Sequence, residues 1–435
     1  KLSQLKNQHL EQKLECHRLD NFTVTADKQG VGRFTKASYP VRYGRYGEIK
    51  SADYLFEYNL NAEIKTIRGL NGNWPHPAEW LKRTAANDWV YYSVGRYHRL
   101  FSFLGEFYLP CLPYPSNSPW EYNPFGDIDI QNALAAAYRL PADLRPMLAN
   151  EIPANFKDYL GCVVENDART LNRKTEKLHD ILGGAVSVLP PDTRHVDYDV
   201  IPLMVADGCL YDCGFCCIKS RQRYQRRPQE NIDRQIRFLK RFYGSDLCNY
   251  NALFLGNHDA LAAGRETIRH AASAAYQAFG FERAYIKNPT LFLFGSVDSL
   301  LNADHQLFEV LERTPFYTYI NVGLESADDF TLALINKPLQ RVKIKAAFQK
   351  MLDINRQYLN IEVSANFLLG EHLPPAHQDA LMDLIRSNLK RTYSKGAIYL
   401  SPFNTSRNHN QLLRQFVEIK IKSRLPAYLY LIQRL

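Results

Sequence analysis

The sequence has no apolar run that approaches the ~20 residues needed to span a membrane, so we predict no transmembrane segment. Its first residues, KLSQLKNQHLEQKLEC, are polar and lack the apolar stretch of a secretory signal peptide. Cysteine is scarce, with eight in 435 residues, yet four of the eight fall within residues 209–217. This clustering favours a metal site in a reducing compartment over a disulfide framework, and we expect a cytoplasmic protein.

The composition is that of a folded globular protein. Hydrophobic residues make up 46% and charged residues 23%, which is too apolar for a disordered chain. The net charge of +9 allows an anionic partner such as RNA, but the cations are scattered, whereas nucleic-acid surfaces gather them. The densest basic run, KSRQRYQRRPQ at residues 219–229, is interpreted as a solvated loop that leads into a helix, with a binding patch as the alternative.

A linker divides the chain near residue 195. Residues 188–199, VLPPDTRHVDYD, contain paired prolines, which interrupt both helices and strands. Residues 1–195 hold all four tryptophans and a dense aromatic and proline-rich stretch at 71–127. We predict an irregular α+β, aromatic-rich N-terminal region that serves an accessory or substrate-determining role. Its aromatic residues can line a binding surface or simply form a core.

Residues 196–435 alternate short apolar runs with longer segments of helical period, as βα units around a parallel sheet do. The expected strands are residues 199–206, 251–257, 290–296, 317–325, 361–370 and 397–402. The expected helices are residues 228–243, 262–279, 298–313, 327–335, 340–355 and 375–391. The fold class is therefore α/β, with a partial (βα)6 TIM-like barrel whose site lies at the carboxyl ends of the strands.

Three cysteines, Cys209, Cys213 and Cys216, follow the first of these strands with the spacing C-x-x-x-C-x-x-C. Thiolates on one short loop can each bind a different corner of an iron–sulfur cube, which leaves one iron open to another ligand. Structural zinc is the alternative, but zinc usually takes two separated ligand pairs, and no second C-x-x-C or H-x-x-x-H follows. We expect the adjacent Cys217 to be a buried cysteine that binds no metal.

This spacing, with the aromatic Phe215 just before the third cysteine, resembles the signature of the radical S-adenosylmethionine (SAM) enzymes. Residues 196–402 resemble the partial barrel of that family. The resemblance implies a 4Fe-4S cluster on the three cysteines and SAM chelated to the fourth iron. It also implies that one electron cleaves SAM to methionine and a 5'-deoxyadenosyl radical, which abstracts hydrogen from a substrate. Such an enzyme needs a reducing electron donor such as flavodoxin or ferredoxin.

The resemblance suggests which residues follow the second strand to meet SAM. The family usually carries a Gly-Gly-Glu-like turn there, which binds the amino group of the cofactor. This chain has Gly256, Asn257, His258 and Asp259 instead. The side chains of the last three can supply hydrogen-bond acceptors for an ammonium group. A polar turn with an exposed His258 is the alternative.

Other strand ends resemble further SAM contacts of the family. Ser296 ends the third strand at a position that resembles one facing the ribose or carboxylate of SAM. Glu325 and Ser326 lie in NVGLESADDFTLALINKP, which strongly resembles the fourth strand and following helix of many radical enzymes. A cap of that helix is the alternative role for Glu325. Leu368, in the fifth strand, and Phe215 are expected to lie near the adenine.

The rest of the chain adds no further cofactor to this prediction. Cys16, Cys111, Cys162 and Cys248 are too dispersed to show the spacing of an auxiliary cluster, and residues 1–195 lack the D-x-H-x-x-G pattern of a cobalamin site. We predict one cluster and an enzyme that acts on a small molecule, lipid or cofactor precursor, with no catalytic residue assigned. An RNA-modifying enzyme remains open because of the basic charge, as does a non-catalytic iron–sulfur carrier or scaffold.

Overall fold

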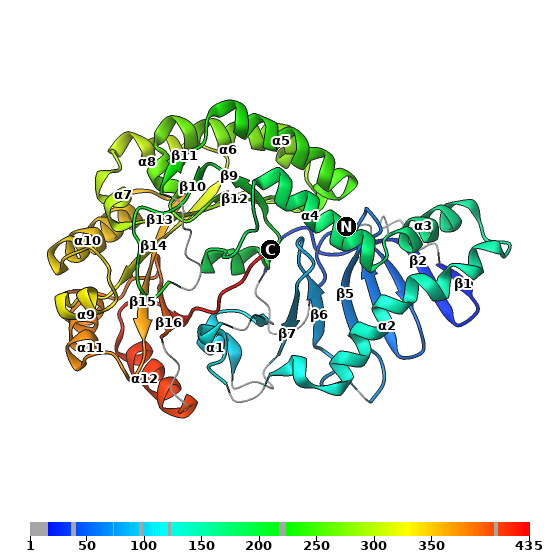
Figure 1. Ribbon diagram of the computed structural model, residues 1–435, viewed down its shortest axis with the longest axis horizontal. Helices are drawn as coiled ribbons and strands as arrows, with labels where there is room; N and C mark the ends of the chain where they lie inside the picture. Colours follow the sequence, from blue (N-terminus) through cyan, green and yellow to red (C-terminus); the bar gives the residue numbers. More distant parts are fainter. Residues whose placement is uncertain are drawn as a thin grey trace, which may run out of the picture.

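The structure is a computed structural model with two large sheets (Figure 1). Eight strands of the N-terminal half form an antiparallel sheet, and seven strands of the C-terminal half form a parallel one. A short ribbon pairs β10 (Ala206–Asp207) with β11 (Gln225–Arg226). The residues described are 16–35, 41–72, 74–94, 99–110, 112, 114–120, 123–216, 223–403 and 408–435.

The N-terminal sheet is a meander in which each strand pairs with the next along the chain. Its strands are β1 (Cys16–Leu19), β2 (Phe22–Gln29), β3 (Arg45–Lys50), β4 (Tyr54–Tyr58), β5 (Ile64–Gly69), β6 (Trp80–Arg83), β7 (Trp89–Tyr92) and β8 (Tyr108–Pro110). This sheet is more regular than the irregular structure predicted from the sequence. The short strand β7 is buried along its whole length, so it lacks the alternation of apolar and polar residues that reveals a strand.

Four helices belong to the N-terminal half of the chain: α1 (Leu100–Leu104), α2 (Ile128–Leu144), α3 (Ala154–Glu165) and α4 (Ala168–Leu182). Helices α2 and α3 lie along one face of the sheet, whereas α4 packs on the C-terminal half (Figure 1). The Asp167 side chain caps α4 by accepting a hydrogen bond from the Thr170 backbone amide. Gly183, whose φ of 78° suits glycine, ends the helix.

The parallel sheet also follows chain order, and it has one strand more than the sequence predicted. Its strands are β9 (Ile201–Met204), β12 (Ala252–Gly256), β13 (Thr290–Gly295), β14 (Tyr317–Glu325), β15 (Ile361–Leu369), β16 (Ile398–Pro402) and β17 (Ala427–Leu429). The six predicted strands are confirmed to within two residues at each end. Among the described strands, the edges β9 and β17 do not pair with each other, so the sheet is open.

Helices cover the outer, convex side of this sheet (Figure 1). They are α5 (Gln229–Tyr243), α6 (Arg265–Phe279), α7 (Val297–Asn302), α8 (His305–Glu312), α9 (Asp329–Leu334), α10 (Arg341–Gln357), α11 (Pro375–Met382) and α12 (His409–Lys422). The single helix predicted at 298–313 is two helices, because Asp304 starts a new one by accepting from the Leu307 amide. The α-helix predicted at 375–391 ends at Met382, and a short π-helix, η8 (Asp383–Ser387), follows. Within the described residues, no helix is long and apolar enough to cross a membrane.

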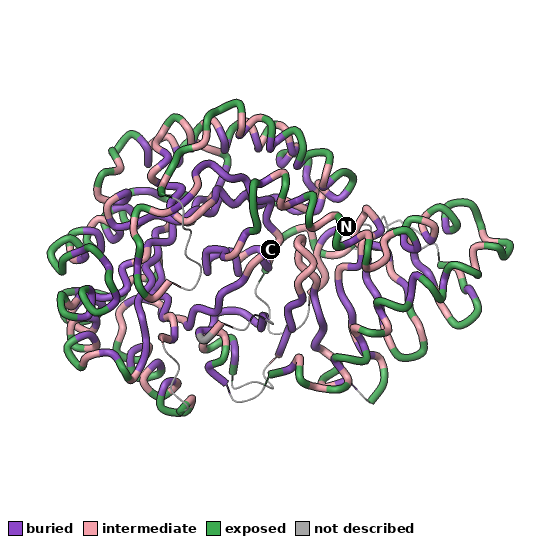
Figure 2. Tube along the Cα trace, viewed as in Figure 1, coloured by how far each residue is buried: buried purple, intermediate pink, exposed green. Residues whose placement is uncertain are grey.

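Short 3-10 helices occupy several connections: η1 (Pro115–Asn117), η2 (Pro124–Gly126), η3 (Pro146–Ala149), η4 (Pro191–Val196), η5 (Gly244–Asn249), η6 (Ala260–Ala263) and η7 (Phe281–Arg283). Helix η4 lies in the segment predicted as a linker, but it is buried on the concave side of the parallel sheet (Figure 2). The Asp192 carboxylate in η4 accepts hydrogen bonds from the Ser364 and Tyr399 hydroxyls at 2.6 Å each. Arg194 donates to the Tyr399 hydroxyl and to the Gly105 carbonyl. The segment is therefore part of the core.

Candidate active site

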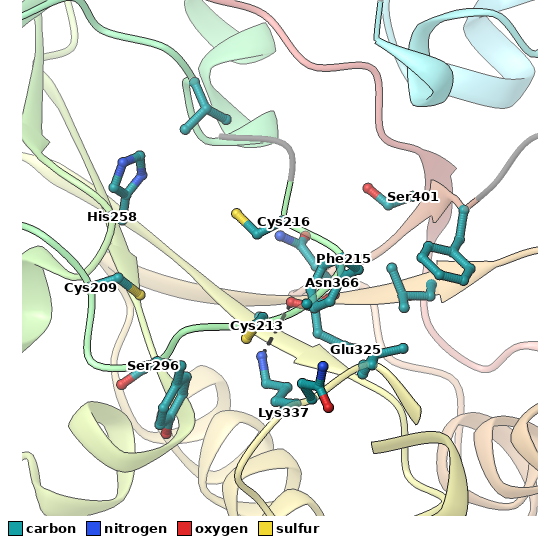
Figure 3. A pocket seen from close by; sticks show the side chains of 18 of the residues that line it. Cys209, Cys213, Phe215, Cys216, His258, Ser296, Glu325, Lys337, Asn366 and Ser401 are labelled. Carbon is teal, nitrogen blue, oxygen red and sulfur yellow. Dashed lines mark hydrogen bonds and ion pairs between the residues drawn. The ribbon is translucent and has the colours of Figure 1, made fainter. Parts of the chain in front are cut away.

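A cavity of about 540 Å³ lies at the carboxyl ends of the parallel strands (Figure 3). The ends of β13, β14, β15 and β16 form one side, and the loop after β10 forms the other. Eight of the residues predicted from the sequence line it: Cys209, Cys213, Phe215, Cys216, His258, Ser296, Glu325 and Leu368. The parallel strands therefore gather residues up to 159 positions apart, as the sequence predicted for the ends of βα units.

The cysteine loop is anchored to two neighbouring elements. The Tyr211 hydroxyl donates to the Asp298 carboxylate at 2.8 Å and accepts from the Asp298 backbone amide at 3.0 Å. The Gly214 amide donates to the Ile335 carbonyl at 2.9 Å. These contacts fix the loop to the start of α7 and to the end of α9, although nothing in the sequence marked Tyr211 or Asp298.

Three thiols surround one end of the cavity (Figure 3). Cys213 is buried, and Cys209 and Cys216 are partly exposed. Among the described residues, no three His, Cys, Asp or Glu side chains converge as ligands of a single metal ion do. A cluster needs no such convergence because each cysteine binds a different iron, so the three thiols suit a cluster better than one zinc ion. Burial raises the pKa of the Cys209 thiol, and bound iron would favour its thiolate form.

Glu325 forms a buried ion pair with Lys337, a cavity residue that the sequence analysis missed. The Lys337 Nζ lies 3.4 Å from Oε1 of Glu325, and their side chains are only 4% and 11% exposed. Burial raises the pKa of Glu325, and the charge of Lys337 opposes that rise. Lys337 Nζ also lies 5.4 Å from the ring centroid of Tyr211, within reach of a cation–π interaction.

Backbone geometry turns Glu325 into this position. Its φ is 65°, in the left-handed region, and the pairing of β14 with β15 shifts register between Gly323 and Glu325. The alternative role of Glu325 as a helix cap is wrong. Asp328 caps α9 by accepting from the Thr331 amide at 2.9 Å.

Asp259 is hydrogen-bonded to Ser296, a residue that lines the cavity. Its buried Oδ1 accepts hydrogen bonds from the Ser296 amide at 3.1 Å and from the Ser299 hydroxyl at 2.7 Å. Ser296 in turn caps α7 and presents its side chain at the cavity. Burial raises the pKa of Asp259 and lowers that of His258, so burial favours the neutral form of both. The partly buried His258 lines the cavity, whereas Asn257 does not.

Gly256, Asn257, Asp259 and Ser326 are not among the described residues that line the cavity. Ser326 is buried, and its hydroxyl lies 2.8 Å from Nδ1 of His377. Contacts between these four residues and SAM stay a prediction.

Two distant segments complete the cavity wall. Tyr430 and Ile432 come from the C-terminal segment after β17, and Ser116 comes from η1 in the N-terminal half. The neighbouring Asn117 holds the two segments together, because its side chain exchanges two hydrogen bonds with the Ile432 backbone. No sequence pattern links residues more than 300 positions apart, so the sequence analysis missed this wall.

The other cysteines lie elsewhere. Cys16 is in β1, Cys162 is in α3 and Cys248 is in η5. Within the described ranges none of them belongs to a group of ligands fit for a metal ion. The predictions for Cys111 and Cys217 lie outside the described residues.

Comparison with known proteins gives one family. Residues 203–385 match the Radical SAM superfamily. No curated protein matches the chain.

Solved structures resemble the chain at low identity. The cobalamin-dependent SAM radical enzyme OxsB is 12% identical, with 54% of this chain and 32% of OxsB covered and a TM-score of 0.34. A radical SAM methyltransferase from Sphaerobacter thermophilus is 13% identical, with 53% and 66% covered and a TM-score of 0.34. Streptococcus suis SuiB is 10% identical, with 87% and 71% covered and a TM-score of 0.34. The matched region thus spans about a third of the length of OxsB.

Proposed function

Because this chain is an enzyme of the radical SAM superfamily, which uses a 4Fe-4S cluster and SAM, we propose that it abstracts hydrogen from a small molecule, lipid or cofactor precursor. When bound, the cluster and SAM supply the reductive cleavage of SAM and the carbon radical that attacks the substrate. The observation that carries the proposal is the shared cavity, in which the three cysteines face the polar ends of the parallel strands.

Cys209, Cys213 and Cys216 would hold the cluster. Their position on one loop leaves the open side of the cavity for SAM and substrate. The anchors at Tyr211 and Gly214 would keep the loop in shape when iron is lost or gained.

The residues that we propose to contact SAM lie on two sides of the cavity. His258, Ser296 and Glu325 offer polar atoms for the amino, carboxylate and ribose groups of SAM. Phe215 and Leu368 belong to a small apolar cluster completed by Ile335, Leu373 and Phe403. An apolar, partly aromatic cluster of this kind suits the flat face of an adenine ring, which supports the adenine site predicted from the sequence.

The substrate would lie toward Asn366, Ser401 and the C-terminal segment. The Asn366 side chain donates to Oδ1 of Asn321 at 2.6 Å, and this bond fixes the orientation of its amide. Tyr430 and Ile432 would help to keep water from the radical. We propose that residues 1–195 determine the substrate and that residues 196–435 form the catalytic core. Ser116 of the first region lines the cavity, which supports this division.

The scarcity of cations in the cavity disfavours RNA as the substrate relative to a small molecule, lipid or cofactor precursor. Of the described residues that line it, Lys337 is the only lysine or arginine, and Glu325 already neutralises its charge. Phosphodiester groups are usually bound by several cations, so an RNA substrate has weaker support.

The test is SAM cleavage by the protein reconstituted with iron and sulfide under anaerobic conditions. With dithionite and SAM, we expect 5'-deoxyadenosine from the parent protein and from Cys248→Ala, a control outside the cavity. Cys213→Ala should lose both the product and most of the roughly four irons per chain. No 5'-deoxyadenosine from a preparation with a spectroscopically reducible cluster would reject the enzyme in favour of a carrier or scaffold. Deuterium transfer from candidate substrates into 5'-deoxyadenosine would then identify the substrate.

A further inference from the structure

The outer surface next to the cysteine loop is strongly basic. Residues 223–243 carry seven cations and two acids, which gives this segment a net charge of +5. The net charge of the whole chain is +9, so this short segment holds more than half of the excess positive charge. We call this region, formed by β11 and the exposed face of α5, the β11–α5 surface. Its cations are Arg223, Arg226, Arg227, Arg234, Arg237, Lys240 and Arg241, all exposed except the half-buried Arg227.

Few acidic groups neutralise this surface. Asp207 pairs with Arg227 through two hydrogen bonds of 2.8 and 2.5 Å. Asp233 faces His270 on α6 at 2.7 Å, and Glu230 is exposed in the first turn of α5. Of the remaining cations, Arg223 and Arg226 lie before α5, and the others lie on the face that α5 turns to solvent. Their field is therefore available to a partner.

A hollow of about 260 Å³ marks part of this surface. Arg226, Arg227 and Arg234 line it together with Asp180 and Asp207. Arg227 engages Asp207, and Asp180 adds a second carboxylate, so the three arginines of the hollow exceed its two acids by one charge.

The β11–α5 surface begins beside a predicted cluster ligand. Arg223 forms an isolated β-bridge with Cys209, and Gln225 pairs with Asp207 in the β10–β11 ribbon. Figure 1 shows α5 on the outer side of the sheet, where it packs against β9, α4 and α6. Two exposed apolar side chains, Leu210 beside Cys209 and Phe238 on α5, are each 43% exposed.

We propose that the β11–α5 surface docks an acidic one-electron carrier protein of the flavodoxin or ferredoxin type. This inference rests on the proposed function, in which a cluster on Cys209, Cys213 and Cys216 must be reduced. One electron passes from the reduced cofactor of the carrier to the oxidised cluster, and no atom is transferred. Opposite charges steer the two proteins together, and the apolar residues Leu210 and Phe238 supply contact area.

An RNA would also be attracted to these cations, but the geometry favours an electron carrier. Among the described residues, none lines both the hollow and the cavity. RNA held at the hollow would therefore need further contacts to place a base in the cavity. An electron carrier needs only to come near the cluster. Arg223, which forms a β-bridge with Cys209, puts a positive charge of the docking surface at that point.

The test reverses two exposed charges on α5 with Arg234→Glu and Arg237→Glu in one protein. A matched control reverses Arg283 and Arg313, two exposed cations on η7 and at the end of α8. Stopped-flow spectroscopy follows oxidation of flavodoxin hydroquinone by each cluster-loaded protein. At low salt we expect the α5 variant to react about tenfold more slowly than the parent, because steering raises association rates by 10- to 1,000-fold. The difference should shrink at high salt, and the control should match the parent.

Dithionite bypasses docking, so the α5 variant should form 5'-deoxyadenosine at the parent rate with this reductant. Equal rates of flavodoxin oxidation for the α5 variant and the parent would overturn the docking proposal. If those rates are equal and the variant loses affinity for polyuridine in fluorescence anisotropy, the surface binds nucleic acid instead. If the parent accepts electrons from flavodoxin but cleaves no SAM, the proposed function fails while the docking surface stands.

Discussion

Lys337→Met removes the cation that lies 3.4 Å from the Glu325 carboxylate. Both side chains are nearly buried, and removing one partner of a buried ion pair costs about 3–5 kcal/mol because the other charge is left unpaired. The ion pair has one contact, and at 3.4 Å that contact is long. We therefore take the low end of this energy range and expect the variant to lose about 3 kcal/mol of unfolding free energy. Glu325→Gln combined with Lys337→Met removes both charges and should stay within about 1 kcal/mol of the parent.

The loss should depend on pH in a defined direction. Burial raises the pKa of Glu325 even with Lys337 present, so removing Lys337 raises that pKa further. A raised pKa in the folded state means that the fold favours the protonated carboxyl. The cost of Lys337→Met is therefore largest above the raised pKa and shrinks as the pH falls through it toward the unfolded value of about 4.3.

Urea unfolding of the cluster-free proteins measures this effect. Circular dichroism and tryptophan fluorescence, recorded together at about pH 8 and about pH 5, test whether each transition is two-state. The reasoning is refuted if Lys337→Met unfolds at the parent urea concentration at the higher pH. It is equally refuted if the gap between variant and parent widens as the pH falls.

Two further changes probe the loop anchor and the buried helix η4. Tyr211→Phe removes the hydroxyl that bridges the Asp298 carboxylate and amide, so iron bound per chain after reconstitution should fall while the circular dichroism spectrum stays that of the parent. A parent-like iron content would show that the loop keeps its shape without this contact. Asp192→Ala leaves the Ser364 and Tyr399 hydroxyls without their acceptor and should cost about 3 kcal/mol, whereas Asp192→Asn keeps one acceptor oxygen and should cost less. Thermal denaturation ranks the two variants, and equal losses would contradict this account.

The sequence predicted the parallel strands well because central strands buried on both faces are continuous apolar runs. The run TLFLFG became β13, buried at every position. The cysteine loop was equally accessible to prediction, because Cys209, Cys213 and Cys216 lie within eight residues. Strand ends such as Ser296 and Glu325 could be assigned to the same cavity, since parallel strands bring their carboxyl ends together.

The parts that could not be predicted depend on contacts distant in sequence. Ser116 and Ile432 meet at the cavity only because segments more than 300 positions apart in the sequence pack together. Glu325 itself has a left-handed backbone conformation at the end of β14, and this conformation turns its side chain toward Lys337. No pattern of hydrophobicity reveals such a conformation. The paired prolines Pro190 and Pro191, the second of which begins η4, correctly indicated an interruption of strands and α-helices, but they gave no sign that the segment is buried.

The buried position of η4 limits how modular this architecture is. The superfamily match begins at residue 203, whereas Asp192 and Arg194 lie before it and bind to β15 and β16. A catalytic core trimmed at the family boundary would lose these contacts and expose polar side chains that the core now satisfies. Exchange of the N-terminal half with that of another enzyme would have to carry η4 and its partners along. New specificity is therefore more accessible to this chain through substitutions inside a shared core than through the shuffling of whole domains.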